Sequence, residues 1–264
     1  MNRLSEKLKN LKDNNKKALV AYLVAGDPDL ETTLDLMHLF VESGVDVIEI
    51  GVPFTDPIAE GPTIQKAHDR ALKNNISLKM ILDLVKKFRE SNTDTPIVLM
   101  GYLNTFISHI DLVQSIDEKS ADSILVVDVP GELDLKTYGI SNPNINTISL
   151  ISPTTKDDRL KSIAKNSTGF IYYVTLRGVT GSSNLNIEEI KSNISKIKQY
   201  SDVPTMAGFG IKSVEDAKVL AESSDGIVIG SSIVEMIADG SKTKEFDRIG
   251  NYLREIKTAI LWTG

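Results

Sequence analysis

The sequence predicts a single domain, residues 1–264, folded as a (β/α)8 barrel. Eight short, β-rich apolar runs alternate with longer stretches whose apolar residues recur at helical spacing. Most of the runs are continuous in apolar residues, which is typical of parallel strands that are buried on both faces. The length of 264 residues matches the roughly 250 residues of a typical single barrel of this class.

The eight apolar runs are expected to form the barrel strands in chain order. They are residues 18–25, 45–52, 96–102, 121–127, 145–151, 169–175, 203–207 and 225–229. An extra N-terminal helix over residues 1–15 should precede them, because Leu4, Leu8 and Leu11 recur at spacings of four and three.

An open doubly wound sheet is the alternative fold. It would usually carry a G-x-G-x-x-G turn after the first strand, whereas residues 25–29 read AGDPD. No Pro/Ser-rich tract or block of like charge divides the chain. The loop 177–186, RGVTGSSNLN, is the connection richest in Gly and Ser, and it is expected to be a mobile lid rather than a domain boundary.

The composition excludes several classes of partner and chemistry. The net charge of −6 leaves no broad positive field for nucleic acid or an anionic membrane, so a phosphate must be held locally. The absence of cysteine excludes disulfides, thiolate nucleophiles and Cys-ligated metals, and fits a reducing compartment. The charged N-terminus lacks a signal-peptide core, and the apolar run 18–26 is too short to span a bilayer. A soluble, cytoplasmic protein is expected.

Chemistry in such barrels lies at the C-terminal ends of the strands. None of the eight runs contains Lys, His or Cys, which argues against a Schiff-base lysine and a His-ligated metal. His38, His68 and His109 fall in or beside helical stretches and are expected to be surface or packing residues. We therefore expect no metal or cofactor in this chain, although carboxylates alone leave a magnesium site open.

Glu49 and Glu60 are the candidate catalytic residues. Glu49 lies among apolar residues near the end of the second run, where a carboxyl is either paired or has a raised pKa. A raised pKa would let it give and take a proton near neutral pH. Glu60 follows in a proline-stiffened loop, far enough along the chain to curl back over the same strand end. The alternatives are a salt bridge for Glu49, and solvent exposure or helix capping for Asp56 and Glu60.

Three glycine clusters follow the last three strands, at 177–181, 208–210 and 230–232. Each alone could be a turn, but glycines beside a helix N-terminus form phosphate sites at this end of barrels. Between the clusters and the carboxylates, the strand ends supply large and mostly apolar side chains. These are Tyr22, Met100, Tyr102, Val127, Ile151 and Tyr173. A substrate with a phosphate at one end and a flat apolar ring at the other would fit.

The motifs resemble those of the tryptophan synthase alpha subunit along nearly the whole chain. The matching segments begin at Ile48 (IEIGVPFTDPIAEGPTIQ), Val127 (VDVP), Arg177 (RGVTG), Gly208 (GFGI) and Gly230 (GSSIV). The resemblance implies a (β/α)8 lyase that cleaves indole-3-glycerol phosphate to indole and glyceraldehyde 3-phosphate by a retro-aldol reaction. The family's catalytic glutamate falls on Glu49. Its second carboxylate, most familiar as aspartate, falls on Glu60, which is longer by one methylene.

The resemblance also implies binding residues and a partner. Phosphate contacts fall on Gly181, Gly210, Gly230 and Ser231, the lid threonine on Thr180, and pocket tyrosines on Tyr102 and Tyr173. The family passes indole to a beta subunit that carries pyridoxal phosphate, usually in an αββα heterotetramer. We expect Pro53 and Asp56 to lie at that interface.

Three alternatives stay open on the sequence. A barrel like indole-3-glycerol phosphate synthase would use strand-end lysines, and none occur here. A non-catalytic subunit that only activates the partner predicts loss of the acidic residues, yet both positions are acidic. A free-standing indole-releasing lyase is the third.

Overall fold

The computed structural model describes residues 2–174, 187–208, 210–211, 213–243 and 246–261. Eight parallel strands form a closed barrel in the order β1 to β8, with β8 paired back to β1. The strands are β1 Ala18–Val24, β2 Val47–Gly51, β3 Ile97–Gly101, β4 Ser123–Val126, β5 Asn146–Ile151, β6 Ile171–Val174, β7 Thr205–Gly208 and β8 Gly226–Ile229. Each lies on one of the eight apolar runs, so the predicted fold class is confirmed.

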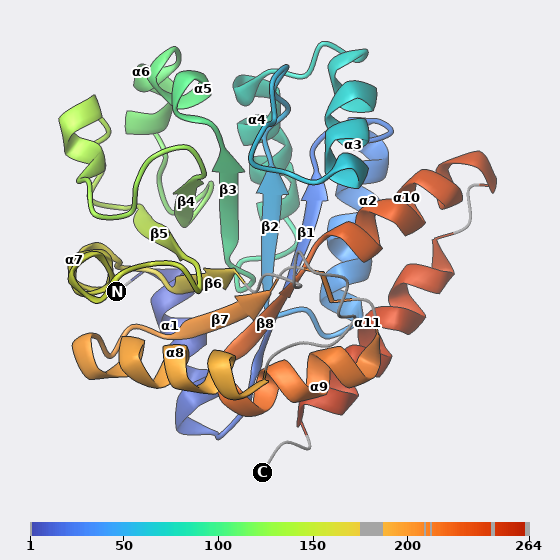
Figure 1. The fold of residues 1–264 in the computed structure, drawn as a ribbon. Coiled ribbons are helices and arrows are strands. Elements are labelled where there is room, and N and C mark those ends of the chain that lie inside the picture. Colours follow the sequence, from blue (N-terminus) through green and yellow to red (C-terminus); the bar gives the residue numbers. More distant parts are fainter. Residues whose placement is uncertain (1, 175–186, 209, 212, 244–245, 262–264) are drawn as a thin grey trace.

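Helices surround this barrel (Figure 1). They are α1 Arg3–Asp13, α2 Leu30–Glu42, α3 Pro62–Leu72, α4 Leu78–Arg89, α5 Leu103–Ile107, α6 Ile110–Gln114, α7 Asp157–Asn166, α8 Ile187–Tyr200, α9 Val214–Ser223, α10 Ser231–Thr243 and α11 Asp247–Leu261, with a 3₁₀ helix η1 at Leu135–Tyr138. Several begin at a polar side chain that accepts a hydrogen bond from the first turn. Asn2, Asp29, Ser77 and Ser213 cap α1, α2, α4 and α9 in this way.

Alternate residues of each strand face opposite sides of the barrel wall. The outward side chains pack against the helices in one large cluster, and the inward ones fill the barrel. All seven residues of β1 are buried, as the continuous apolar run predicts. Along β1 and β2 the register pairs Tyr22 with Glu49. Both side chains face inward, and they set the floor of the site described below.

The N-terminal helix α1 closes the opposite end of the barrel. Leu4, Leu8 and Leu11 are buried in the same cluster as inward side chains of the barrel strands. Arg3, at the start of the helix, lies 2.5 Å from Asp122 before β4, and Arg89 of α4 lies 2.9 Å from the other oxygen of this carboxylate. The helix is therefore part of the barrel core, and the chemistry is left to the other end.

Replacing Leu4 by alanine should lower the free energy of unfolding by about 2–5 kcal/mol, because the side chain is fully buried under the barrel. Urea unfolding measures the change. Lys9→Ala, at an exposed position of the same helix, is the control, and its effect should stay within about 0.5 kcal/mol. Equal effects of the two substitutions would show that α1 is not part of the core.

Candidate active site

A cavity of about 280 Å³ opens at the C-terminal ends of the strands. Two acidic residues line it, Glu49 from β2 and Glu60 from the loop that follows β2. Other predicted site residues in its wall are Tyr22, Met100, Val127, Gly210, Gly230 and Ser231. The structure therefore brings together residues that are up to 209 positions apart, from Tyr22 to Ser231. Carboxylates, apolar side chains and glycines share one space.

Glu49 is only 1% exposed, and its Oε1 atom has no hydrogen-bond partner among the described residues. No cation in that part of the chain pairs with it. Burial, and secondarily the negative charge of Glu60, raise the pKa of Glu49 to about 8. The carboxyl can therefore bind and release a proton near neutral pH, and the salt-bridge alternative has no support among the described residues.

Glu60 is also buried, and its Oε2 atom has no hydrogen bond of good geometry among the described residues, but polar side chains lie against it. Nε2 of His68, on α3, lies 2.7 Å from its Oε2 atom. The hydroxyl of Tyr102 accepts the backbone N–H of Ala59 at 3.0 Å, next to Glu60 in the loop. Burial, and then the charge of Glu60, raise the pKa of Tyr102 to about 12, so its hydroxyl keeps its proton. The two carboxyls thus have different surroundings, which suits them to different roles.

Two tyrosines form the sides of the cavity, and glycines make room for both. A Cβ atom on Gly51 would lie 2.2 Å from the hydroxyl of Tyr22, and one on Gly208 would lie 3.0 Å from the ring of Tyr172. Burial and the charges of Glu60 and Glu49 raise the pKa of Tyr22. Its hydroxyl has no hydrogen-bond partner in the described structure. The glycines in the neighbouring strands therefore leave room for the rings of Tyr22 and Tyr172 in the cavity wall.

The opposite side of the cavity is formed by the start of α10. Gly230 and Ser231 line the cavity there, and the first N–H groups of a helix have no partner within the helix. Ser232 donates to the carbonyl of Ile211 at 2.7 Å and ties this turn to the segment after β7. Gly210, at a φ of 70°, lines the cavity beside it. Such a helix start is a suitable site for a phosphate without any lysine.

Two predicted lining residues are corrected. Tyr173 and Ile151 lie in the outer cluster between strands and helices, and the Tyr173 hydroxyl accepts a hydrogen bond from Asn193 of α8 at 2.9 Å. Their neighbours Tyr172 and Leu150 line the cavity instead. Because neither run alternates cleanly between apolar and polar residues, the sequence does not show which residues face inward.

Tyr102 is not part of the cavity wall but lies behind Glu60. Its ring stacks on that of Phe54, with centroids 4.7 Å apart, and its hydroxyl holds the loop at Ala59. It therefore supports the loop that carries Glu60.

His68 was missed by the sequence reasoning, which treated it as an ordinary surface or packing residue. It is buried on the inner face of α3 and contacts Glu60. The only sequence signal is its position eight residues after Glu60, on the helix that the loop enters.

The interface expectation for Pro53 is also corrected, because this residue is buried beneath the loop. Asp56 is exposed, and its carboxylate accepts a hydrogen bond from the hydroxyl of Thr55 at 2.6 Å. Thr180, Gly181 and the predicted lid 177–186 lie outside the described residues.

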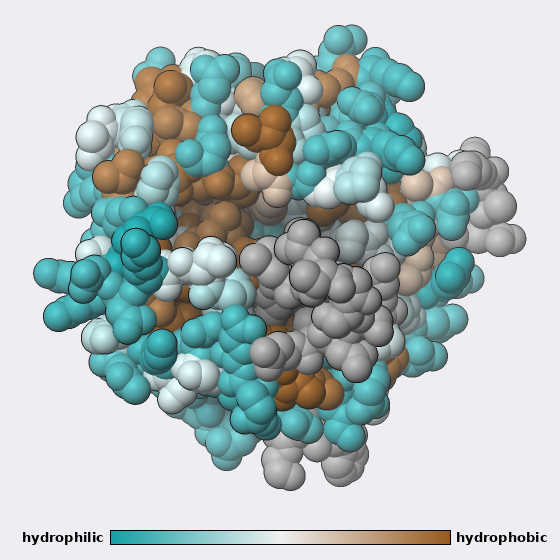
Figure 2. Space-filling model, viewed as in Figure 1, coloured by the Kyte–Doolittle hydropathy of each residue, from teal (hydrophilic) through white to brown (hydrophobic). Residues whose placement is uncertain are grey.

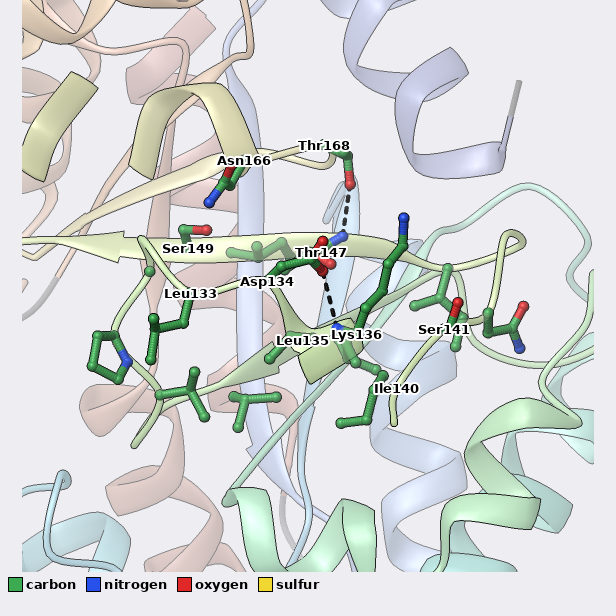
Figure 3. Close-up of a pocket in the computed structure, with 18 of the residues that line it drawn as sticks. Leu133, Asp134, Leu135, Lys136, Ile140, Ser141, Thr147, Ser149, Asn166 and Thr168 are labelled. Atoms are coloured by element: carbon green, nitrogen blue, oxygen red, sulfur yellow. Dashed lines mark hydrogen bonds between the residues drawn. The ribbon is translucent and has the colours of Figure 1, made fainter. Parts of the chain in front are cut away.

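A second cavity, of about 530 Å³, lies beside β4 and β5 (Figure 3). The short helix η1 follows β4 where a full helix would be expected. Asp134 caps η1 by accepting from the N–H of Lys136, and Thr168 accepts from the N–H of Thr147. No pair of buried carboxylates lines this cavity, unlike the smaller one.

Comparison with known proteins identifies the family. The family model described as tryptophan synthase alpha chain matches residues 8–260. The tryptophan synthase alpha chain of Nitrosomonas europaea is 42% identical over 264 residues, covering 98% of this chain and 96% of the relative. The chain belongs to the tryptophan synthase alpha chain family. The family resemblance that the motifs predicted is confirmed.

Solved structures of the family agree. The tryptophan synthase alpha subunit of Legionella pneumophila aligns with a TM-score of 0.86 at 38% identity, over 98% of each chain. A chain from the tryptophan synthase a2b2 complex of Pyrococcus furiosus aligns with a TM-score of 0.79 at 34% identity, over 90% of this chain and 97% of that one.

The described part of this chain contains no candidate metal site and no membrane-spanning helix. No cluster of three or more His, Asp or Glu residues there could hold a metal ion. None of its described helices has both the length and the apolar character needed to cross a membrane.

The raised pKa of Glu49 has a cost in stability that substitution should reveal. In the folded chain its pKa is about 8, against an ordinary value of 4.5. Folding therefore favours the protonated form, and the stability associated with this group is lost as the pH rises toward and through 8. Glu49→Gln removes the group. Relative to the wild type, the variant should gain on the order of a few kcal/mol in unfolding free energy between pH 5 and pH 9.

Urea unfolding of both proteins at pH 5, 7 and 9 measures this gain. Glu90→Gln, at an exposed helix end, is the control and should show no such trend. A constant difference between Glu49→Gln and the wild type at all three pH values would contradict the raised pKa.

Proposed function

We propose that Glu49 and Glu60 carry the reaction of the family in this chain, the cleavage of indole-3-glycerol phosphate to indole and glyceraldehyde 3-phosphate. The observation that carries the proposal is a pair of buried carboxyl groups in one cavity with unlike surroundings. One has a pKa raised to about 8, and the other faces a histidine and a tyrosine. The enzyme is thus a carbon–carbon lyase.

The reaction breaks the bond between C3 of the indole ring and the first carbon of the glycerol chain. Protonated Glu49 gives its proton to C3, which becomes tetrahedral while positive charge develops on the ring nitrogen. Glu60 accepts a hydrogen bond from the ring N–H and stabilises that charge. Glu49, now a carboxylate, takes the proton of the chain hydroxyl. The C–C bond electrons return to the ring, and the aldehyde forms, so one proton has moved from oxygen to carbon.

The remaining wall of the cavity suits the rest of this substrate. Tyr22, Met100, Val127, Leu150 and Tyr172 offer apolar surface to a flat ring. The phosphate would lie at the start of α10 against Gly230 and Ser231, with Gly210 beside it. Thr180 and Gly181, predicted to close the site, remain proposals for the loop 177–186. Closure of that loop would exclude water from the reaction.

A non-catalytic subunit is the less favoured alternative. A carboxyl that is buried without a partner lowers stability, and an idle site would have no reason to keep one. The indole-3-glycerol phosphate synthase alternative lacks its strand-end lysines in every described strand.

We further propose that the chain works with a beta subunit in an αββα heterotetramer in the cytoplasm. The related Pyrococcus furiosus chain comes from an a2b2 complex. In the family, pyridoxal phosphate belongs to the beta subunit, so this chain would need no cofactor of its own. Exposed Ile58, Ile107 and Leu133 follow three consecutive strands at the mouth end of the barrel, with 85%, 40% and 44% exposure. Hydrophobic side chains also gather around α5 and in the hollow below it (Figure 2). Exposed apolar groups clustered in this way are typical of an interface.

Glu49→Gln should reduce the rate of indole release by about 10²–10⁴-fold, because the amide cannot transfer a proton but keeps the shape of the side chain. Binding of a glycerol-phosphate ligand, measured by isothermal titration, should be unchanged. Glu90→Gln, at the exposed end of α4, is the control. A rate within about threefold of the wild type would reject Glu49 as the proton shuttle.

Asp56→Ala tests the route from the partner to the site. The loop from β2 places exposed Asp56 and Ile58 on its outer side and Glu60 on its inner side. Docking on the outer side should therefore order Glu60 and raise turnover. Without the beta subunit the variant should release indole at nearly the wild-type rate, and with it should lose most of the activation.

By linkage, a ligand that orders the alpha site should tighten subunit binding by the same free energy, typically about 1–3 kcal/mol. Asp35→Ala, at an exposed position of α2, is the control. Full activation of the Asp56 variant by the beta subunit would show that Asp56 does not couple the two subunits.

A further inference from the structure

His68 contacts both ends of the loop that carries Glu60. Its Nδ1 atom accepts the backbone N–H of Phe54 at 3.0 Å, at the start of the loop. Its Nε2 atom lies 2.7 Å from Oε2 of Glu60, near the end of the loop, a close contact in which the two atoms are not aligned as a hydrogen bond. The imidazole ring is 1% exposed, so water does not compete for either contact. A single side chain of α3 thus contacts residues at both ends of the loop.

The contact with Phe54 determines which nitrogen carries the proton. A backbone N–H can only donate, so Nδ1 must present its lone pair. A neutral imidazole then has its one proton on Nε2, and this nitrogen faces the Glu60 carboxylate. The backbone of the loop therefore fixes the tautomer that can donate toward Glu60.

Glu60 needs such a donor for two reasons. It has one more rotatable bond than the aspartate most familiar at this position, so more rotamers compete with the useful one. Its negative charge also lies close enough to Glu49 to raise the pKa of that group, so the two carboxylates repel each other. A fixed donor behind Glu60 opposes both effects. A carboxylate offers about four lone-pair positions, so acceptors remain for a ring N–H.

We propose that His68 is a positioning residue, which holds the Glu60 carboxylate in the orientation that receives the ring N–H of the substrate. This inference rests on the role proposed above for Glu60. His68 itself lies behind Glu60 and does not line the cavity. It acts in two ways, by anchoring the loop through Nδ1 and by aiming the carboxylate through Nε2.

Three substitutions separate these two actions. His68→Gln places an amide nitrogen near the position of Nε2, so it keeps a donor toward Glu60 and loses the acceptor for Phe54. His68→Asn places an amide oxygen near the position of Nδ1, so it keeps the acceptor for Phe54 and loses the donor. His68→Leu loses both. His38→Gln, on α2 where the ring packs against Phe88, is the matched control.

Indole release from indole-3-glycerol phosphate is measured for each variant in the complex with the beta subunit. His68→Asn and His68→Leu should lower kcat by about 10²-fold, with KM nearly unchanged, because the phosphate and the ring are still bound while the carboxylate is misplaced. His68→Gln should recover most of the lost kcat. His38→Gln should match the wild type.

A purely structural role for His68, as an anchor for the loop, predicts the reverse order, with the Asn variant active and the Gln variant impaired. That order, or equal loss in both variants, would overturn the proposal. Glu60→Ala in the same assay distinguishes the role of Glu60 from the role of His68. Wild-type kcat in Glu60→Ala would reject the role of Glu60 itself. Low kcat in Glu60→Ala together with normal kcat in His68→Asn would reject only the positioning by His68.

A spectroscopic measurement on the wild type keeps the test valid even if a variant does not fold. Long-range 1H–15N correlation spectra distinguish the two imidazole tautomers. The proton of His68 should be on Nε2. A proton on Nδ1 would contradict both the contact with Phe54 and the donor toward Glu60, and would overturn the proposal.

Discussion

The carboxyl of Glu49 is buried inside a closed barrel without a neutralising partner among the described residues, and the rest of the site is arranged around this fact. Burial raises its pKa into the range where one group can both give and take a proton. The same burial lowers the stability of the fold near neutral pH, since the charged form is poorly solvated. The large apolar core in and around the barrel offsets that cost. A stable scaffold is therefore a condition for the chemistry.

The loop between β2 and α3 connects this buried group to the surface. Glu60 lies on its inner side, where its charge acts on Glu49, while Asp56 and Ile58 lie on its outer side. The loop is held at Phe54 by His68, at Ala59 by Tyr102 and at Glu60 by Gln65. These contacts come from α3 and from the end of β3, and they hold the loop backbone on either side of its exposed segment. The arrangement would let one short segment serve both the proposed catalysis and the proposed partner.

The proposed phosphate end of the cavity uses a different principle. The chain carries a net charge of −6, and the cavity wall there consists of glycines and the start of a helix. Backbone N–H groups supply partial positive charge without a cation that would neutralise Glu49 or Glu60. The proposed anion site and the carboxylates lie on different sides of the cavity. The partial positive charge at one side therefore does not neutralise the negative charge at the other.

The sequence by itself determined the barrel, the strand positions and the two carboxylates at its mouth. Strand length and continuous apolar runs report burial on both faces, and an acidic residue within such a run is visible without coordinates. The same runs do not show which side chains of a strand face into the barrel. Ile151 and Tyr173 were expected in the cavity, and only the closed barrel showed that Leu150 and Tyr172 face inward. The partner of Glu60 was hidden for a similar reason. Whether a helical histidine meets a loop carboxylate depends on how the chain turns between them, and that turn is fixed by tertiary contacts at Phe54 and Ala59.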